Sequence, residues 1–562
     1  MPGLLTVPLA ARPVPRVQEV LPKGSGDLFR RREFLCGVAT LTVGSATSLV
    51  VPSSAYGGER NPVESKGSLH ARICDAEGGH TVFARCYLSD ASGSSWSPPG
   101  AVQYVKPPER NFIAPGEFSV ALPPGTYSLT VERGPEYRAV KRAIEIRSGQ
   151  TCEEKIEVPH LFHMNTRGWY SGDLHNHRDP KEMPHLLLAN DLNLAPTLTE
   201  WIWDNGPQSS APILPAASGA VRQVDPTHSY SLVDTEIERL GEGPGAVDLV
   251  GLSTPLAFRG YLLSPPNSVF TEMAHRQGGY VDAEKITWRD TAALVALGQV
   301  DFAGIVHNHF NRHGVLTETD KWGMIPKEKP EYSTPQGMPL WAIEVYYKFL
   351  NCGFRLPVSA GSASGVMASP LGFNRVYVHL QGGFDYHKWC RALKAGRSFG
   401  TNGPMLFLTV QGYEPGDEIK LASGKANGAR LKVHAEAYTS GDLDRLEIIW
   451  KGQIMKSLSA GAAAQSLVAD FEADVGRSGW VAARAFERPS EAVRFAHTSP
   501  VYVKAPGDRG LVAEAARFFL RSIDREISFY DKLPTFRTEA DRENMVTLFR
   551  RARGVYEGLA RA

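Results

Sequence analysis

The sequence predicts a multidomain protein of the α/β plus β class, in which a central α/β region is flanked by two β-sandwiches and followed by a helical hairpin. Apolar and polar residues alternate with a period of two over 66–160 and 405–505, as in half-buried strands. Over 167–404, short apolar strands alternate with helical stretches, which is typical of parallel strands joined by crossover helices. Over 508–562, apolar residues recur at helical spacing. A chain of 562 residues, 42% of them hydrophobic, is also too long for one ordinary core.

Residues 1–57 are expected to be a twin-arginine export signal. Arg31-Arg32 is followed by the uncharged, apolar or small stretch Phe34–Val51, and Ser53–Ala55 offers small residues for cleavage. The alternative is a single membrane anchor, but the stretch is short and rich in Gly, Ser and Thr, which makes it weakly hydrophobic. We therefore expect the twin-arginine machinery to export the protein across the cytoplasmic membrane, to the periplasm or the exterior.

The N-terminal strands are expected to form a small β-sandwich over 66–160. Leu69–Ile73 and Tyr127–Val131 alternate in polarity, and Pro123–Gly125 and Arg133–Pro135 mark turns. This region is similar to the regulatory-like domain appended to some carboxypeptidases, which presents or packs against a catalytic domain. A carbohydrate-binding module is the alternative, although no aromatic platform favours it.

The later elements follow the same patterns. Within 167–404, Asp290–Leu297 and Tyr386–Ala395 have helical spacing. Strand patterns return at Arg430–Ala435 and Leu446–Trp450, which predicts the second β-sandwich over 405–505. The tail is expected to fold as two antiparallel helices, Leu511–Tyr530 and Glu539–Leu559, separated by Pro534.

Charge and cysteine content narrow the function classes. Sixty-one basic residues face sixty acidic ones, so we expect no nucleic-acid partner and no anionic membrane surface as a partner. Five cysteines remain after the signal, with no zinc-ribbon spacing among them. Cys74 pairs with Cys86 or Cys152 in an oxidising compartment, or all are buried free thiols. The five are Cys74, Cys86, Cys152, Cys352 and Cys390.

The sharpest chemical pattern is Ser171–His177, at the start of the α/β region. On an extended strand, residues two apart point the same way, so His175 and His177 can bind one ion from one side. Neutral imidazole suits zinc, manganese or iron, at about 2.0–2.2 Å. Two histidines at this spacing on a surface are equally common, but the position after Gly168–Tyr170 favours a metal site.

Asp173–His177 resembles the opening motif of the polymerase and histidinol phosphatase (PHP) superfamily. The resemblance is closest to the CehA/McbA-type metallohydrolases, which are named for enzymes that hydrolyse the carbamate ester carbaryl. It spans about Arg167–Pro404 and implies a distorted (β/α)7 barrel that holds one to three divalent metals at the carboxyl ends of its strands. Later segments that carry the resemblance are Glu344–Tyr347, Asn351–Pro357, Ser359–Ser364, Asn374–Val378 and Leu393–Pro404.

Several family ligands are replaced in this chain. The usual Asp-His after the second strand corresponds to Thr199–Trp201, and the Gly-His to Gly245–Ala246. The Ala-His-Pro corresponds to Ala283–Lys285, which offers a carboxylate in place of an imidazole. The closing Asp-x-His corresponds to Ser362–Ser364, where neither serine is a good ligand. The full trinuclear site therefore cannot be assembled.

A reduced set of ligands remains for one or two divalent ions. Glu236 is the best match to the bridging glutamate, and a second H-x-H pair, His307 with His309, follows the apolar stretch Phe302–Val306. The alternative is a domain that has lost its metals and kept its shape. The predicted metal ligands are His175, His177, Glu236, Glu284 and His309.

Other residues near these ligands are candidates for catalysis. Glu200, Glu238 or His307 would shuttle the proton. Lys285 stabilises a developing oxyanion or forms a salt bridge with its neighbour Glu284, and Arg178 meets a substrate anion or faces solvent. The candidate catalytic residues are Glu200, Glu238, His307, Lys285 and Arg178.

These features predict an exported metal-dependent hydrolase that acts on an ester, carbamate or related bond. The substrate is a small molecule or a polymer of the cell envelope. A PHP-type phosphoesterase is the alternative, but only Arg178, Lys285 and Arg312 offer the basic groups that a phosphate needs. A non-catalytic protein that binds a glycan or envelope component, and a metal-scavenging protein, are the rivals from other classes. The sequence gives no indication of oligomeric state.

Overall fold

The computed structural model describes residues 65–203, 206–209, 219–317, 325, 328–422 and 429–562. The chain divides into two compact units, Met1–Pro62 and Val63–Ala562, and the elements below belong to the second. The expected export signal, residues 1–57, lies outside the described residues. None of the described helices is long and apolar enough to cross a membrane.

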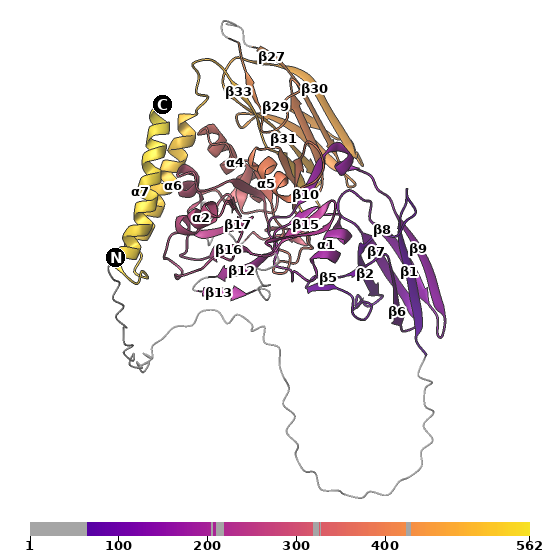
Figure 1. The fold of residues 1–562 in the computed structure, drawn as a ribbon. Coiled ribbons are helices and arrows are strands. Elements are labelled where there is room, and N and C mark those ends of the chain that lie inside the picture. The colour runs from indigo at the N-terminus through magenta and orange to yellow at the C-terminus, as the bar shows by residue number, and fades with distance from the viewer. Residues whose placement is uncertain (1–64, 204–205, 210–218, 318–324, 326–327, 423–428) are drawn as a thin grey trace, which may run out of the picture. The chain divides into compact units, whose positions relative to one another are not determined.

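The N-terminal strands form two sheets that enclose a core of their own (Figure 1). Buried and exposed residues alternate strictly along Glu117–Leu122, so one face of that strand meets the core and the other meets water. The sheet orders are β6-β1-β9 and β4-β5-β2-β7-β8, with β3 beside β2. The strands are β1 (Gly67–Asp75), β2 (Ala84–Asp90), β3 (Ser95–Trp96), β4 (Gln103–Lys106), β5 (Glu109–Ala114), β6 (Glu117–Leu122), β7 (Gly125–Glu132), β8 (Val140–Ile146) and β9 (Thr151–Val158).

The predicted (β/α)7 barrel is wrong. The described residues form many strands but only seven α-helices, and the strands of 167–404 fall into two large sheets of mixed direction and one two-stranded sheet. In a (β/α)7 barrel the strands are parallel, and each connection needs about a dozen residues or more for its crossover helix. Here β16 (Asp234–Arg239) and β17 (Gly245–Val250) are antiparallel neighbours joined only by Leu240–Pro244, and β17 is also antiparallel to β18 (Tyr280–Ala283).

One of these sheets has seven strands in the order β13-β12-β16-β17-β18-β19-β22. One face of it carries apolar side chains such as Ile237, Val247 and Val281, which belong to the largest core of the molecule. Because side chains alternate along a strand, the other face carries Glu236, Asp248 and their neighbours. The remaining strands are β12 (Leu198–Trp203), β13 (Gly206–Ser209), β19 (Phe302–Val306) and β22 (Val358–Ala360).

A twelve-stranded sheet runs from the central region into the C-terminal strands. Its main path is β14-β15-β11-β10-β23-β24-β32-β31-β28-β29, with β33 on β31 and β26 on β33. β24 (Ser398–Thr401) pairs with β32 (Phe495–Thr498), so the sheet of the central region continues into the strands after residue 405. Further strands are β10 (Trp169–Gly172), β11 (Leu194–Ala195), β14 (Val221–Asp225), β15 (His228–Ser231), β23 (Arg375–His379), β26 (Glu418–Lys420), β28 (Leu443–Trp450), β29 (Gln453–Ser459), β31 (Gly479–Glu487) and β33 (Val501–Lys504).

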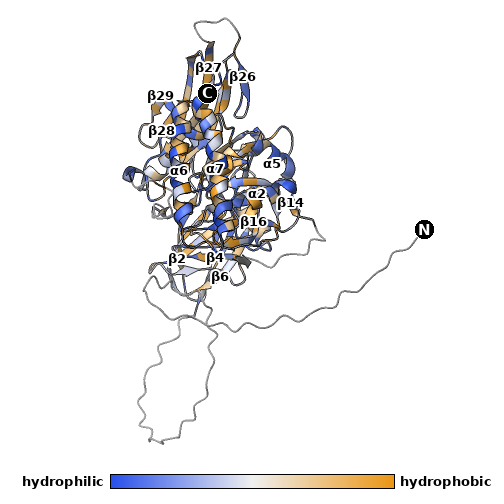
Figure 2. Cartoon of the chain, turned by 90° about the vertical axis from the view of Figure 1, so that its left-hand side faces the viewer, coloured by the Kyte–Doolittle hydropathy of each residue, from blue (hydrophilic) through white to orange (hydrophobic). Residues whose placement is uncertain are grey.

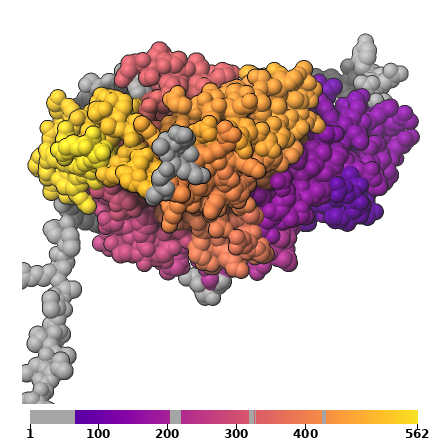
Figure 3. Space-filling view, turned by 90° about the horizontal axis from the view of Figure 1, so that it is seen from above, coloured from indigo at the N-terminus to yellow at the C-terminus, as the bar shows by residue number. Residues whose placement is uncertain are grey.

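A three-stranded sheet, β25-β27-β30, shares a second core with the C-terminal part of the large sheet. In the space-filling view these orange strands lie between the yellow C-terminal helices and the indigo to purple N-terminal strands (Figure 3). The strands are β25 (Met405–Val410), β27 (Ala429–Tyr438) and β30 (Ser466–Val475), and the short pair β20 (Phe310–Asn311) and β21 (Gly314–Val315) lies outside these sheets.

The last two helices pack side by side (Figure 1). Each carries both hydrophobic and hydrophilic residues (Figure 2), and their apolar residues join the main core, where Phe519 stacks on Phe349 at 4.2 Å between ring centroids. Thr538 caps the second helix by accepting the backbone N–H of Asp541. The α-helices are α1 (Met183–Asn190), α2 (Asn267–Arg276), α3 (Thr291–Ala296), α4 (Gly337–Asn351), α5 (Tyr386–Lys394), α6 (Ala513–Lys532) and α7 (Glu539–Arg561), with 3-10 turns at Met164–Arg167 and Pro330–Tyr332.

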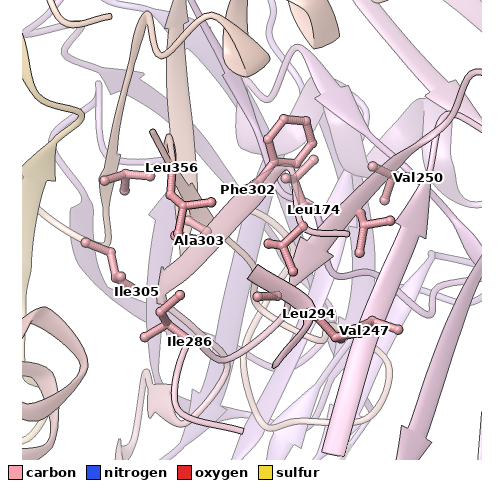
Figure 4. Packing of buried hydrophobic residues seen from close by; sticks show 14 of the residues in the cluster. Leu174, Val247, Val250, Ile286, Leu294, Phe302, Ala303, Ile305 and Leu356 are labelled. Carbon is pink, nitrogen blue, oxygen red and sulfur yellow. The ribbon is translucent and has the colours of Figure 1, made fainter. Parts of the chain in front are cut away.

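The main core supports the chain immediately after β10. Leu174 is buried there, and the close-up shows it among Val250, Phe302 and Ala303 (Figure 4). This anchors the segment that carries the H-x-H pair. All five cysteines of the described residues are free thiols, so the disulfide alternative is not realised.

Candidate metal centre

The H-x-H pair follows β10 and does not lie on it, because the strand ends at Gly172. Leu174 points into the core, and a buried carboxylate, Asp173, fixes the segment beside it. The Oδ1 atom of Asp173 accepts the backbone N–H groups of Ser362 (2.9 Å) and His175 (3.2 Å), and Oδ2 accepts that of Gly372 (2.7 Å). Asp173 is therefore a positioning residue that orients the histidines through the backbone.

Three ligand atoms converge beyond this turn. The Nε2 atoms of His175 and His177 are 3.0 Å apart, and Oε2 of Glu236 lies 3.3 Å from the first and 2.9 Å from the second. Ligand atoms bound to one divalent ion at about 2.0–2.2 Å are themselves about 2.9–3.5 Å apart. The edges of the triangle therefore match three ligands of one ion. All three side chains are buried.

The seven-stranded sheet adds a row of carboxylates beside this triangle. Glu236 on β16 pairs directly with Asp248 on β17, which pairs with Asp282 on β18. Directly paired residues project from the same face of a sheet, so the three carboxylates lie side by side. Each is at most 3% exposed, and Ser359 donates a hydrogen bond to Asp282 at 2.7 Å.

The two ring nitrogens of His175 face different partners. Nε2 faces His177 and Glu236, whereas Nδ1 lies 3.3 Å from Oε1 of Glu284 and 3.4 Å from Oδ2 of Asp248. A metal-binding histidine commonly donates its second ring N–H to a carboxylate, which fixes its orientation and raises its basicity. Glu284, predicted as a metal ligand, is therefore placed where it orients His175 and not where it completes the triangle.

Burial and neighbouring charges shift the pKa values of the residues in this cluster. Burial alone would lower the pKa of His175, but Asp248 and Glu236 raise it well above its ordinary value. Burial raises the pKa of Asp248 well above its usual range, and burial lowers the pKa of His177. The side chains therefore hold a proton among themselves where a divalent ion would otherwise supply the positive charge.

Unsatisfied polar atoms support the fit of such an ion. Both oxygens of Asp248, Oε2 of Glu236 and Nδ1 of His177 are buried and make no hydrogen bond within the described part of the chain. Burying a carboxylate oxygen without a partner is costly, and a bound cation removes that cost. Two imidazoles and carboxylate oxygens are a donor set suited to zinc, manganese or iron(II).

The other predicted residues fall into two groups. Lys285 is almost fully buried and forms an ion pair with Glu284, whose Oε2 also accepts the indole N–H of Trp288 at 2.8 Å. Half-buried Glu238, two residues beyond Glu236 on the same face of β16, has its pKa raised by burial and by Glu236. These residues line the centre.

His307 and His309 are buried on the turn after β19, with ring centroids 5.5 Å apart. Burial and Lys285 lower the pKa of His307 to about 3, so its imidazole is neutral. Among the described residues, the group around His175 that comes within 4.8 Å includes neither of these histidines. His309, predicted as a ligand, is therefore near the centre but outside the triangle.

Two predicted residues lie away from it. Glu200 pairs with Thr235, and the next residue, Trp201, pairs with Glu236, so Glu200 projects from the opposite face of the sheet. Trp201 instead contacts His177, with ring centroids 5.1 Å apart. Arg178 donates to Glu182 (2.9 Å) and to the backbone oxygen of Gln103 (3.0 Å), and so joins the N-terminal strands to the central region.

In a second group of possible ligands, Glu136, His160 and Asp191, the two carboxylates already have protein donors. Glu136 accepts the hydroxyl of Tyr377 at 2.9 Å and the backbone N–H of Met164 at 3.0 Å. Asp191 pairs with Arg133 at 3.1 Å. The triangle of His175, His177 and Glu236 is therefore the stronger of these two candidate metal sites among the described residues.

Asp248 and Asp282 were not predicted from the sequence. Each interrupts a short apolar strand, in Ala246–Val250 and in Tyr280–Ala283. A charged residue inside such a strand is costly unless it is paired. An aspartate within an apolar strand was therefore the feature of the sequence that could have indicated these site residues.

Comparisons with known proteins give no family. No protein-family model matches the chain, and no curated protein matches it. Among solved structures it is similar to the minor pilin GBS52 of Streptococcus agalactiae, with 16% identity and a TM-score of 0.15 over 17% of this chain and 46% of that one. It is also similar to the Bacillus anthracis TIE protein, with 9% identity and a TM-score of 0.14 over 78% of this chain and 50% of that one. The chain thus spans about half the length of each, and similarity this weak carries no argument.

Proposed function

We propose that the protein is an exported metal-dependent hydrolase in which His175, His177 and Glu236 hold one divalent ion. The observation that carries the proposal is the triangle of their ligand atoms, with edges of 2.9, 3.0 and 3.3 Å, in a buried site where Oε2 of Glu236 and both oxygens of Asp248 make no hydrogen bond within the described part of the chain. The resemblance of Asp173–His177 to CehA/McbA-type enzymes supports the same chemistry. Export rests on the Arg31-Arg32 motif and the apolar stretch after it.

A divalent ion at the triangle would supply a water of lowered pKa and would polarise the bond to be broken. The residues around it have separate tasks. Asp248 and Glu284 hold Nδ1 of His175, which keeps Nε2 directed at the ion. Glu238, half-buried beside Glu236, is the carboxyl group that would shuttle a proton during hydrolysis.

The arrangement of cations favours an ester, carbamate or amide over a phosphoester. Phosphate transfer normally uses several converging basic groups. Lys285 is paired with Glu284, Arg178 is held by Glu182, and Arg312 makes a bidentate pair with Glu132. A neutral carbonyl substrate needs only the ion and one donor.

The test is elemental analysis of the exported protein together with turnover on ester, carbamate and phosphodiester panels. The variant is His175→Ala/His177→Ala, and the matched control is His387→Ala/His434→Ala, which removes two accessible histidines elsewhere. About one equivalent of zinc, manganese or iron that is lost only in the first variant, together with loss of ester or carbamate hydrolysis, would support the proposal.

Absence of bound metal in the wild type would overturn the proposal in favour of a glycan- or envelope-binding protein. Stoichiometric metal without turnover of any panel would overturn it in favour of metal scavenging. Phosphodiester hydrolysis alone would replace the ester assignment with a PHP-type phosphoesterase.

A further inference from the structure

A cavity of about 120 Å³ lies where the N-terminal strands, the central region and the C-terminal strands meet. Arg85 and Glu132 come from the first of these, and Arg312 and Arg375 come from the second. Arg494 and Ser440 line it from the third, the region beyond residue 405. Four arginines therefore border one small polar space that the metal centre does not use.

The cavity holds more positive than negative charge. Glu132 is the one acidic residue among those that line it. It accepts two hydrogen bonds from Arg312, at 2.7 and 2.8 Å, and one from Arg85 at 2.8 Å. Burial would raise the pKa of Glu132, but these two arginines hold it well below its ordinary value, so the residue is ionised. Glu109, 3.5 Å from Nε of Arg312, is a second carboxylate near this pair, so Arg85 and Arg312 are both compensated.

Arg375 is the least compensated of the four. It is 1% exposed and donates only to neutral groups, chiefly the backbone oxygens of Gly372 (2.7 Å) and Asn190 (3.1 Å). No carboxylate of the described chain comes within 4.0 Å of its guanidinium nitrogens. A buried charge without a counter-ion is costly, and backbone oxygens offset only part of that cost.

Arg494 completes the lining from the C-terminal side. Its Nη1 donates to the backbone oxygen of Asn402 at 3.1 Å, and its Nε lies 3.9 Å from Glu487. About a third of its side chain is exposed, so it has donors left for a ligand.

We propose that this cavity binds a small tetrahedral oxoanion, either inorganic phosphate or sulfate. Guanidinium groups match such anions because each presents paired N–H donors in a plane. A space of about 120 Å³ is large enough for one oxoanion. The negative charge would provide the counter-ion that Arg375 lacks.

This site is distinct from the metal centre and does not depend on the proposed function. Gly372 lines the cavity, and its N–H donates to Asp173, so the two sites are neighbours that share a backbone loop. A phosphate-binding experiment must therefore exclude binding at the metal centre.

The test is calorimetric titration of the metal-free full chain with sodium phosphate, sodium sulfate and, as a control at equal ionic strength, sodium chloride. We expect saturable binding of phosphate or sulfate and none of chloride. Arg494→Gln should raise the dissociation constant about tenfold or more, since it removes a charge-assisted donor. Arg477→Gln, an exposed arginine of the same region, is the matched control and should bind like the wild type.

Two further variants keep the result interpretable. Ser440→Asp places a carboxylate at the exposed rim of the cavity and should abolish oxoanion binding while raising the melting temperature of the anion-free protein. His175→Ala/His177→Ala should bind the oxoanion as the wild type does. The proposal would be overturned if Arg494→Gln and Ser440→Asp bound the oxoanion as tightly as the wild type. Loss of binding in the histidine variant would overturn it as well. Tighter binding of glycerol 3-phosphate than of phosphate would overturn the free oxoanion as occupant.

Discussion

The charge of Glu236 can be removed without changing the size of its side chain. In Glu236→Gln an amide replaces the carboxylate whose Oε2 lies 2.9 Å from Nε2 of His177 and 3.3 Å from Nε2 of His175. Packing is kept, but the one anionic vertex of the triangle becomes neutral. Loss of an outer-shell partner costs about 10–100-fold in metal affinity, so we expect loss of this ligand to cost about 100-fold or more.

The size of the effect follows from linkage. At a free metal concentration of 100 times the wild-type dissociation constant, binding stabilises the native state by about 2.7 kcal/mol. If the dissociation constant rises about 100-fold, the same metal concentration stabilises the native state by only RT ln 2, or about 0.4 kcal/mol. For a folding region of about 150–250 residues, 1 kcal/mol shifts the melting temperature by about 2–4 °C. The metal-induced rise should therefore fall from about 5–10 °C to about 1–2 °C.

The assay is thermal unfolding of chelator-treated protein with and without added zinc or manganese. Glu200→Gln is the matched control, because it makes the same change on a neighbouring strand but on the opposite face of the sheet. It should keep the wild-type response. The reasoning is refuted if Glu236→Gln shows the same metal-induced rise as the wild type.

Two further predictions concern packing and pH. A Cβ at Gly172 would lie 2.5 Å from Cζ2 of the buried Trp389 ring, so Gly172→Ala should lower the free energy of unfolding by about 1–3 kcal/mol in urea titrations. Gly383→Ala meets nothing within 4 Å and should stay close to the wild type, and equal stability of the two variants would contradict the packing argument. Burial lowers the pKa of His497 to about 3, from an unfolded value of about 6.5, so between these pH values the unfolded chain binds a proton that the native state does not. Native stability should therefore fall with decreasing pH below about 6.5, by up to about 1.4 kcal/mol per pH unit from this residue, and His497→Gln should remove that contribution. A wild-type minus variant difference that is constant from pH 7 to pH 4 in urea unfolding would count against it.

Local features of the fold could be predicted because they depend on local periodicity. The alternation in Tyr127–Val131 and the helical spacing in Glu539–Leu559 each coincide with an element of that type. The arrangement of strands was predicted wrongly for the central region, since it came from a motif resemblance and not from the connections. Leu240–Pro244 contains two glycines and a proline within five residues, which indicates a hairpin and excludes a crossover helix.

Continuity of the large sheet could not be read from the sequence at all. The pairing of β24 with β32 joins residues almost a hundred positions apart, such as Gly400 with His497. Nothing in either short strand specifies the other, because sheet partners are chosen by burial and by the shape of the whole core. Domain boundaries at 405 and 505 therefore stay a prediction.

The residues of the candidate metal centre, too, could be predicted only in part from the sequence. His175 and His177 are two residues apart and were predicted from spacing alone. Glu236 was predicted only through the family motif, and Asp248 and Asp282 become neighbours of it only through strand register. A one-residue shift of that register would turn Asp248 into the apolar core.

The strand register also determines which charges are buried together. A sheet that buries Ile237, Val247 and Val281 on one face must place the residues between them on the other face. In this chain those residues include Asp248 and Asp282, which are buried there with His175 and Lys285 as nearby cations among the described residues. Two acids and their neighbours Glu236 and Glu284 exceed what those two cations neutralise. A divalent cation at the proposed site would balance that charge, which is the electrostatic argument for the proposed metal.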